Sequence, residues 1–253
     1  MSIHFQVLGS GNPLIVIHGL FGTSDNLKAI AKGLAEDFKV FLIDAPGHGD
    51  SDTVEPLTLT TMAEEVKTFA EAQGLTNFSI LGHSLGGKIA MELAVNNPEL
   101  IDKLIVADIA PVKYPRRHDS ILAALKSVPL ENLASRSQAD KKLQENIHEP
   151  GVRGFLLKSL AKDPDTSAWE WKFDLDALEQ NYDNLVDANS DGKFTGDVLF
   201  IIGGASNYVL PEHKEQITNR FPNVKPKIIQ GTGHWLHAEK PNAFTKICRE
   251  FLL

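Results

Sequence analysis

The chemistry of this sequence centres on Ser84, which stands in the pentapeptide Gly-His-Ser-Leu-Gly at residues 82–86. A serine in this G-x-S-x-G spacing acts as a nucleophile when a strand precedes it and a helix follows it. The apolar run at residues 78–81 and the helical pattern after Ser84 supply that context. The free N–H groups at the start of such a helix stabilise negative charge, so the chemistry indicated is attack on a carbonyl carbon. The alternative is a glycine–serine turn without chemistry.

A serine nucleophile needs a base, and His234 has the best context among the nine histidines. It ends the segment Gly-Thr-Gly-His at residues 231–234, on the loop between the last predicted strand and the last predicted helix. That loop lies at the same edge of the sheet as Ser84. His237 competes for the role, but its position near the start of a helix favours a packed or exposed side chain. The pair His234 and His237 lacks further metal ligands, so we expect neither a metal nor a cofactor.

The acid that orients the histidine is harder to locate. Proteins with this turn usually carry it after the strand predicted here at residues 198–202, but residues 203–211 contain no carboxylate. Asp108 instead closes the apolar run at residues 104–107, on the strand next to that of Ser84. A carboxylate at the end of a buried strand needs a polar partner. We therefore assign Asp108 as the acid.

Two further residues bear on this assignment. Glu212 is an alternative acid, although the start of a helix also explains a carboxylate there. The remaining alternative is a site with no acid at all. Ser206 occupies the usual position of the acid, and we hypothesise that its hydroxyl hydrogen-bonds Asp108 or His234 and helps to hold their geometry.

The segment His-Gly-Leu-Phe-Gly at residues 18–22 indicates an oxyanion hole. It follows the strand predicted at residues 14–17 and matches the loop that supplies one backbone N–H to such a site. Leu20 is the expected donor and Phe21 the close alternative. The second expected donor is the N–H of Leu85, directly after the nucleophile. The alternative is a glycine-hinged turn with no role in catalysis.

Short apolar runs separated by amphipathic segments must position these residues. Such runs are typical of strands buried on both faces of a parallel sheet, and their alternation with helices predicts a doubly wound α/β fold. Strands are predicted at residues 14–17, 40–43, 78–81, 104–107, 198–202 and 226–229, with an antiparallel edge strand at 3–8. Helices are predicted at residues 60–73, with Thr60 as the N-cap, and after Ser84, Pro211 and Pro241.

The alternation breaks once, between residues 111 and 191. Helical segments are predicted there at residues 117–128, 130–147 and 151–161, with no convincing strand. An insertion of this kind between two strands predicts a helical cap. We therefore expect a core formed by residues 1–110 and 192–253 and a cap formed by residues 111–191, the two making one structural unit.

Composition excludes several classes of protein. The 25 basic and 33 acidic side chains give a net charge of −8, which disfavours nucleic acid and anionic lipid as partners. No apolar run is long enough for a bilayer, and the N-terminal residues lack the pattern of a signal peptide. Cys248 is the single cysteine, which excludes an internal disulfide. We expect a cytoplasmic protein with a small-molecule substrate and no membrane insertion, and the sequence does not indicate its oligomeric state.

These motifs resemble, in order, those of the α/β-hydrolases. The matching segments are His18-Gly19, Asp44-x-x-Gly47-x-Gly49-x-Ser51, Gly82-x-Ser84-x-Gly86, Gly233-His234-Trp235 and Glu239-x-Pro241. The chain is more closely similar to YbfF-type esterases and the abhydrolase-domain-containing 11 group, through Asp108-Ile109-Ala110-Pro111, Arg116-Arg117-His118-Asp119 and Phe155-Leu156-Leu157-Lys158-Ser159. The resemblance implies an α/β-hydrolase fold with its helical cap after the sixth strand of the family's sheet, and an acid at the same place, which supports Asp108. The segment Ala45-Pro46-Gly47 departs from the Arg-Asn turn of many members, away from the proposed catalytic positions.

The reaction expected is hydrolysis of a carboxylic ester or thioester through an acyl-enzyme on Ser84. The pair Arg116 and Arg117 suits phosphate recognition and would favour acyl-CoA substrates, although solvated charge at a helix start is the alternative. Leu122 and Trp235 are further candidate substrate contacts. A catalytically silent relative that acts as a ligand receptor is the other function considered.

Overall fold

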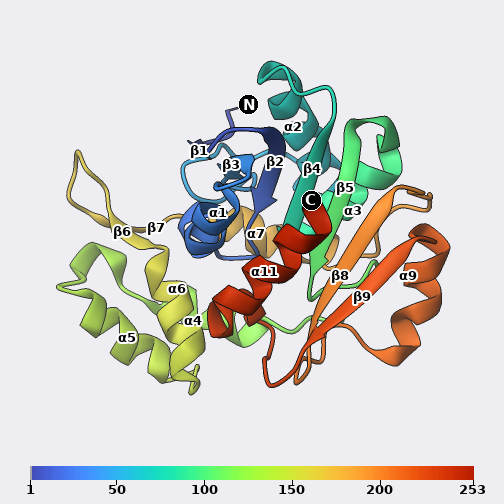
Figure 1. Ribbon diagram of the computed structural model, residues 1–253. Coiled ribbons are helices and arrows are strands. Elements are labelled where there is room, and N and C mark those ends of the chain that lie inside the picture. The colour runs from blue at the N-terminus through green and yellow to red at the C-terminus, as the bar shows by residue number, and fades with distance from the viewer. Residues whose placement is uncertain (1) are drawn as a thin grey trace.

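The computed structural model describes residues 2–253 and contains a seven-stranded sheet with helices on both faces (Figure 1). The strand order is β1-β3-β2-β4-β5-β8-β9, and only β1 runs antiparallel to its neighbour. The strands are β1 (Phe5–Leu8), β2 (Asn12–Ile17), β3 (Phe38–Ile43), β4 (Phe78–His83), β5 (Ile101–Ala107), β8 (Asp197–Gly203) and β9 (Val224–Ile229). Each strand predicted from the apolar runs is present, and the mostly parallel α/β sheet is confirmed.

The sheet separates two apolar cores. Leu14 and Val16 of β2 pack on the face covered by α1 (Lys28–Leu34) and α11 (Pro241–Leu252). The alternate residues Ile15 and Ile17 pack on the opposite face, which is covered by α2 (Leu59–Ala72), α3 (Leu85–Asn96) and α9 (Lys214–Arg220). Because both faces are buried, the strands need apolar residues at every position, and this explains the continuous runs. The carboxyl ends of the parallel strands meet at one edge, where the loops that carry Ser84, Asp108 and His234 begin.

Four helices of the core agree with the predicted segments apart from their ends. These helices are α2 (Leu59–Ala72), α3 (Leu85–Asn96), α9 (Lys214–Arg220) and α11, with a 3₁₀ turn at Pro211–His213 before α9. The short helices α1 and α10 (Leu236–Glu239) have no counterpart among the predicted segments. The predicted N-cap Thr60 is wrong, because Thr58 has the extended backbone that a cap needs and accepts the Thr61 N–H. Thr60 instead donates to Glu92 of α3. Within residues 2–253, no helix has the length and apolar character needed to cross a bilayer.

The insertion between β5 and β8 contains helices and one small hairpin. Its elements are α4 (Asp119–Ser127), α5 (Arg136–Gln144), α6 (Pro150–Lys158), β6 (Leu160–Lys162), β7 (Trp169–Trp171), α7 (Leu175–Gln180) and α8 (Tyr182–Leu185). In Figure 1, α4, α5 and α6 form a group at the lower left of the sheet. The insertion begins after β5, the strand that Asp108 follows.

Two details of the insertion differ from the sequence prediction. The antiparallel pair of β6 and β7 contradicts the expectation that the insertion has no strand, because three-residue strands are too short to give a periodic pattern. The single helix predicted at residues 130–147 is also wrong. Ser135 adopts an extended conformation and caps α5 by accepting the Gln138 N–H, so only a short 3₁₀ turn precedes it.

Candidate active site

Ser84 lies on a sharp turn between β4 and α3, with φ 53° and ψ −118°. This conformation is strained for an L-residue, and it depends on the absence of side chains at two neighbouring positions. A Cβ at Gly82 would lie 2.1 Å from the Gly86 carbonyl oxygen, and a Cβ at Gly86 would lie 2.4 Å from the Ile17 carbonyl oxygen. The two glycines therefore let the turn close and raise the serine hydroxyl above the sheet edge.

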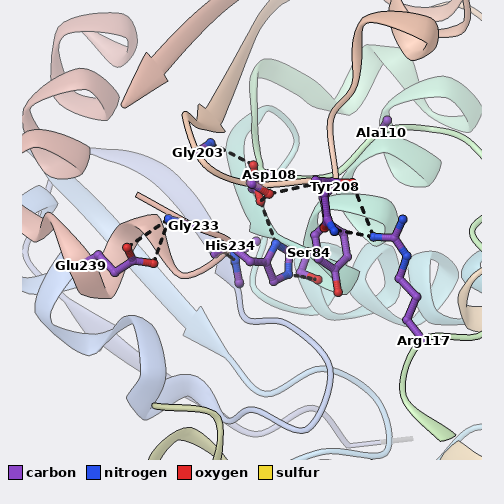
Figure 2. Close-up of polar contacts among 12 residues, drawn as sticks. Ser84, Asp108, Ala110, Arg117, Gly203, Tyr208, Gly233, His234 and Glu239 are labelled. Atoms are coloured by element: carbon purple, nitrogen blue, oxygen red, sulfur yellow. Dashed lines mark hydrogen bonds and ion pairs between the residues drawn. The ribbon is translucent and has the colours of Figure 1, made fainter. Parts of the chain in front are cut away.

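Ser84, His234 and Asp108 form one chain of hydrogen bonds (Figure 2). The Nε2 atom of His234 lies 3.0 Å from Ser84 Oγ, and its Nδ1 atom lies 2.8 Å from Asp108 Oδ2. The carboxylate can only accept at Nδ1, so the neutral imidazole has its proton there and presents Nε2 as an acceptor to the serine hydroxyl. The arrangement can move a proton from Ser84 to His234.

Asp108 is fully buried and held from several sides. The Gly203 N–H donates to its Oδ1 at 2.9 Å, and the Ser206 hydroxyl donates to its Oδ2, the same oxygen that faces His234. The structure thus brings Ser206 to the acid, in the place that the hypothesis gave it. Glu212 lies exposed in the turn before α9 and has no contact with His234.

The imidazole of His234 is also held across its face. The Tyr208 ring stacks on it with a centroid distance of 3.7 Å and an interplanar angle of 14°, and the Arg117 guanidinium lies 4.9 Å from the Tyr208 centroid (Figure 2). The His83 Nε2–H donates to the His234 carbonyl oxygen at 2.8 Å. Tyr208 was missed by sequence reasoning, since a tyrosine in a loop has no pattern of its own. Its place two residues after Ser206 is the one available signal.

Near Ser84, the backbone N–H groups of Leu20 and Leu85 have no hydrogen-bond partner within residues 2–253. The loop of Leu20 passes directly beside the nucleophile, because a Cβ at Gly19 would lie 3.1 Å from Ser84 Cβ. The Phe21 N–H, the alternative donor, is already bonded to His48 Nε2 at 3.2 Å. The geometry therefore offers Leu20 and Leu85 to an oxyanion and leaves Phe21 unavailable.

The chain also matches a known protein family. The family model described as the alpha/beta hydrolase fold matches residues 12–241. The chain belongs to the α/β-hydrolases.

The resemblance to the YbfF and abhydrolase-domain-containing 11 groups is also confirmed. "Esterase YbfF" of Escherichia coli is 35% identical over 244 residues, which cover 96% of this chain and 94% of that protein. "sn-1-specific diacylglycerol lipase ABHD11" of Mus musculus is 33% identical over 248 residues, which cover 94% of this chain and 80% of that protein. A solved structure described as "Marine microorganism esterase" superposes with a TM-score of 0.95 at 36% identity, over 98% of both chains. Relatives with esterase and lipase names support a hydrolase.

In this α/β-hydrolase, two cavities of about 40 Å³ each flank Ser84. One is bounded by Lys88, Tyr114, Arg117, Leu185 and Tyr208. The other is bounded by Ile121, Val152, Phe155, His234 and Trp235. Of the predicted substrate contacts, Arg117 and Trp235 therefore lie at the site.

The other two predicted contacts do not lie at either cavity. Arg116 is exposed and forms ion pairs with Asp119 at 2.8 Å and Asp183 at 2.9 Å. Leu122 is 2% exposed and packs in the apolar core under α4. The structure therefore does not bring Arg116 or Leu122 to the cavities beside Ser84, and their contact with substrate stays a prediction.

Several histidines around the site are buried and neutral. Burial lowers the pKa of His48 to about 3, of His118 to about 4 and of His237 to about 3. His237 packs edge-on against His83 and does not reach Ser84, which agrees with its reading as a packed side chain. His48 is fully buried in the loop that follows β3. These buried histidines are neutral, and His234 is the imidazole that contacts the serine.

Proposed function

We propose that this protein is a serine esterase that hydrolyses small carboxylic esters through an acyl-enzyme intermediate. The observation that carries this proposal is the unbroken chain from Ser84 Oγ through the His234 ring to a fully buried carboxylate, with spacings of 3.0 and 2.8 Å. A buried carboxylate with a single ionisable partner is costly unless that partner can carry positive charge. The chain is therefore suited to hold a histidinium for the short time that a reaction requires.

The first half of the reaction forms the acyl-enzyme. His234 Nε2 takes the proton from Ser84 as Oγ attacks the ester carbonyl carbon, and Asp108 stabilises the imidazolium. The carbonyl oxygen becomes negative and accepts hydrogen bonds from the N–H groups of Leu20 and Leu85. Each such donor stabilises the transition state by about 2.7–4 kcal/mol. His234 then gives its proton to the leaving alcohol, and the carbon–oxygen bond breaks.

The second half releases the acid. A water molecule enters beside His234, which removes its proton while the oxygen attacks the acyl carbon. A second tetrahedral oxyanion forms at the same donors and collapses, and His234 returns the proton to Ser84 Oγ. The carboxylic acid leaves, and the serine is restored.

The leaving group and the acyl group have different cavities in this proposal. The leaving oxygen must receive its proton from His234, so we assign the alcohol to the cavity that His234, Trp235 and Phe155 bound. The acyl group then takes the cavity bounded by Leu185 and Tyr114.

Acyl-CoA thioesters are a second candidate substrate class, which Arg117 favours. Arg117 lines a cavity at Ser84 and forms no ion pair within residues 2–253. Its Nη1 donates only to the uncharged Asn207, so its positive charge is available to an anionic group. Support from Arg116 falls away because Asp119 and Asp183 already neutralise it. Hydrolysis of matched esters and acyl-CoAs of graded chain length, by wild type and Arg117→Gln, separates the two classes. A phosphate contact predicts that the substitution raises KM for acyl-CoA and leaves ester hydrolysis unchanged.

Labelling by a fluorophosphonate tests the esterase proposal itself. We expect intact-mass measurement to show one adduct on wild type and none on Ser84→Ala, with hydrolysis of p-nitrophenyl esters lost in parallel. Ser127→Ala is the matched control, because Ser127 donates to the Ala124 carbonyl oxygen within α4, away from the site. Labelling that persists in Ser84→Ala, or a wild type that binds esters without turning them over, would favour the ligand-receptor alternative.

A further inference from the structure

His48 is fully buried beside the loop that carries Leu20, and it uses both ring nitrogens on backbone groups. Its Nε2 accepts the Phe21 N–H at 3.2 Å, and its Nδ1 lies 3.1 Å from the Pro46 carbonyl oxygen. An amide N–H can only donate and a carbonyl can only accept, so the ring is neutral with its proton on Nδ1. The low pKa that burial gives His48, about 3, keeps the ring uncharged at neutral pH.

Phe21 needs such a partner because its backbone is strained. It has φ 62°, a left-handed conformation that a bulky L-residue adopts only when its surroundings impose it. Its side chain is buried, at 2% exposure, against Phe173 of the insertion. Without His48, the Phe21 N–H would be a buried donor with no acceptor, and the peptide would be free to turn toward another one.

The insertion holds the other polar group of Phe21. The Ser159 hydroxyl, fully buried between α6 and β6, donates to the Phe21 carbonyl oxygen at 2.8 Å. Ser159 is itself fixed, since its carbonyl oxygen accepts the Lys172 N–H at 2.7 Å and the Lys172 carbonyl oxygen accepts the Gly49 N–H at 2.6 Å. The backbone N–H and C=O of Phe21 are thus held by side chains from two separate parts of the chain.

The hydrogen bonds that Phe21 forms with His48 and Ser159 make up a clamp on the loop, and this clamp bears on which donor the loop presents to Ser84. The peptide that joins Leu20 to Phe21 is anchored through the Phe21 N–H, and the peptide after it is anchored through the Phe21 C=O. The Leu20 N–H, one residue earlier, has no acceptor within residues 2–253, and Leu20 lines both cavities beside Ser84. A donor helps catalysis only if it points at the position that the oxyanion will occupy.

We propose that His48 and Ser159 are positioning residues for the oxyanion-binding loop, holding Phe21 from both sides so that the Leu20 N–H points at the reacting carbonyl oxygen. The inference rests on the proposed esterase function and deepens it. It also gives the insertion an indirect part in the chemical step, because Ser159 belongs to that segment. Ser159 itself touches no reacting atom.

A matched pair of variants at His48 tests the first half of the clamp. In His48→Gln the side-chain oxygen reaches the position of Nε2 and can accept the Phe21 N–H, whereas His48→Met has the same length without that acceptor. We expect kcat for a p-nitrophenyl ester to fall about 10- to 100-fold in His48→Met, less than for complete loss of a donor, with KM unchanged. His48→Gln should retain activity within about threefold, since the hydrogen bond is restored.

A transition-state analogue separates positioning from general damage. A trifluoromethyl ketone adds to Ser84 and forms an oxyanion, so its inhibition constant should rise by the factor by which kcat/KM falls in His48→Met. Equal losses in the Gln and Met variants, or a Met variant with unchanged kcat, would overturn the role of His48. If wild type neither hydrolyses esters nor forms the fluorophosphonate adduct, the proposed function itself fails, and this outcome is distinct from the other two.

Ser159→Ala tests the second half and serves if His48→Met does not fold. We expect a smaller fall in kcat, about 3- to 10-fold, because one anchor of Phe21 remains and a single neutral hydrogen bond is lost. Ser127→Ala again provides the control in the same segment, with unchanged kcat. A Ser159→Ala enzyme with wild-type kcat and wild-type affinity for the trifluoromethyl ketone would exclude the insertion from the oxyanion geometry.

Discussion

At the scale of single residues, Asp108 accepts more hydrogen bonds than orientation of one imidazole requires. It accepts from the Gly203 N–H, the Ser206 hydroxyl and His234 while it is fully buried. Its own φ of 53° turns the chain sharply at the end of β5, so that the carboxylate points at the loop of His234. A carboxylate held this firmly fixes the tautomer of His234 as well as its orientation.

Asp108→Asn should therefore lower kcat by about 10³- to 10⁴-fold, because an amide can present a donor to Nδ1 and stabilise the wrong tautomer. Initial rates on a p-nitrophenyl ester measure this change. Asp197→Asn is the control, since Asp197 lies at the start of β8 and pairs only with exposed Lys225. Near-normal turnover in Asp108→Asn would assign the acid elsewhere.

Sequence reasoning located the residues whose chemistry has a local pattern. Ser84 and His234 stand in glycine-rich segments, and Asp108 is a charge that ends an apolar run. Tyr208 and His48 have no such pattern, because their roles come from contacts with His234 and Phe21 that are distant in the chain. The same limit explains Arg116 and Arg117, which sequence treats as a pair and the fold separates.

At the scale of elements, α3 joins the nucleophile to both ends of the insertion. Lys88, one turn after Ser84, donates to the carbonyl oxygens of Val112 and Asp187, at 2.9 and 2.6 Å. Glu92, one turn further, accepts from Asn189 and from the backbone of Ser190, each at 3.0 Å. The two stems of the insertion are therefore tied to the helix whose first turn carries the proposed oxyanion donor Leu85.

Replacing Glu92 should loosen the second stem. Burial by itself would raise the pKa of Glu92, but hydrogen bonds from Ser190, Asn189 and Thr60 outweigh it and lower the pKa. The charged form is therefore stabilised in the folded state, and this stability is present above the unfolded pKa and lost as pH falls through the folded one. We expect Glu92→Gln to lose about 1–3 kcal/mol of unfolding free energy at pH 7 and less at pH 4.

Urea denaturation at the two pH values measures this difference. Hydrogen exchange should also increase at residues 187–191 while β4 and β5 stay protected. Glu145→Gln provides a surface control, because Glu145 pairs with half-exposed Lys142 only. A loss that is equal at both pH values would contradict the charge-based explanation.

At the scale of the whole molecule, the elements around the site enclose histidines that fold in the neutral form. Burial is the main cause of the low pKa values of His48, His118 and His237. A lowered histidine pKa contributes stability above the unfolded value of about 6.5, and this stability is lost as pH falls toward the folded value. The protein should therefore be sensitive to mild acid well before its carboxylates titrate.

Between pH 7.5 and pH 5.5, each of the three histidines should remove about 1.4 kcal/mol of unfolding free energy. Chemical denaturation across this range measures the total, to which these three contribute about 4 kcal/mol. His18 and His83, whose pKa values burial also lowers, add to it. His237→Phe should reduce the pH dependence by about 1.4 kcal/mol, because one titrating group is removed, whereas substitution of exposed His148 by Asn should not. A flat stability between the two pH values would show that these rings are not neutral in the folded protein.

Phe21, Ser84 and Asp108 have a left-handed backbone, and the strain at these residues lowers the thermal stability of the folded protein. Strain of this kind amounts to about 1–3 kcal/mol at each residue. A glycine adopts φ 53° without penalty, so Ser84→Gly should melt several degrees above wild type while losing all turnover, and a calorimetric scan would measure the gain. A Tm equal to that of wild type would mean that the turn is relaxed. Screening variants for thermal stability alone would therefore favour replacement of Ser84 and loss of activity. Stabilising substitutions that keep the activity have to be made at other positions.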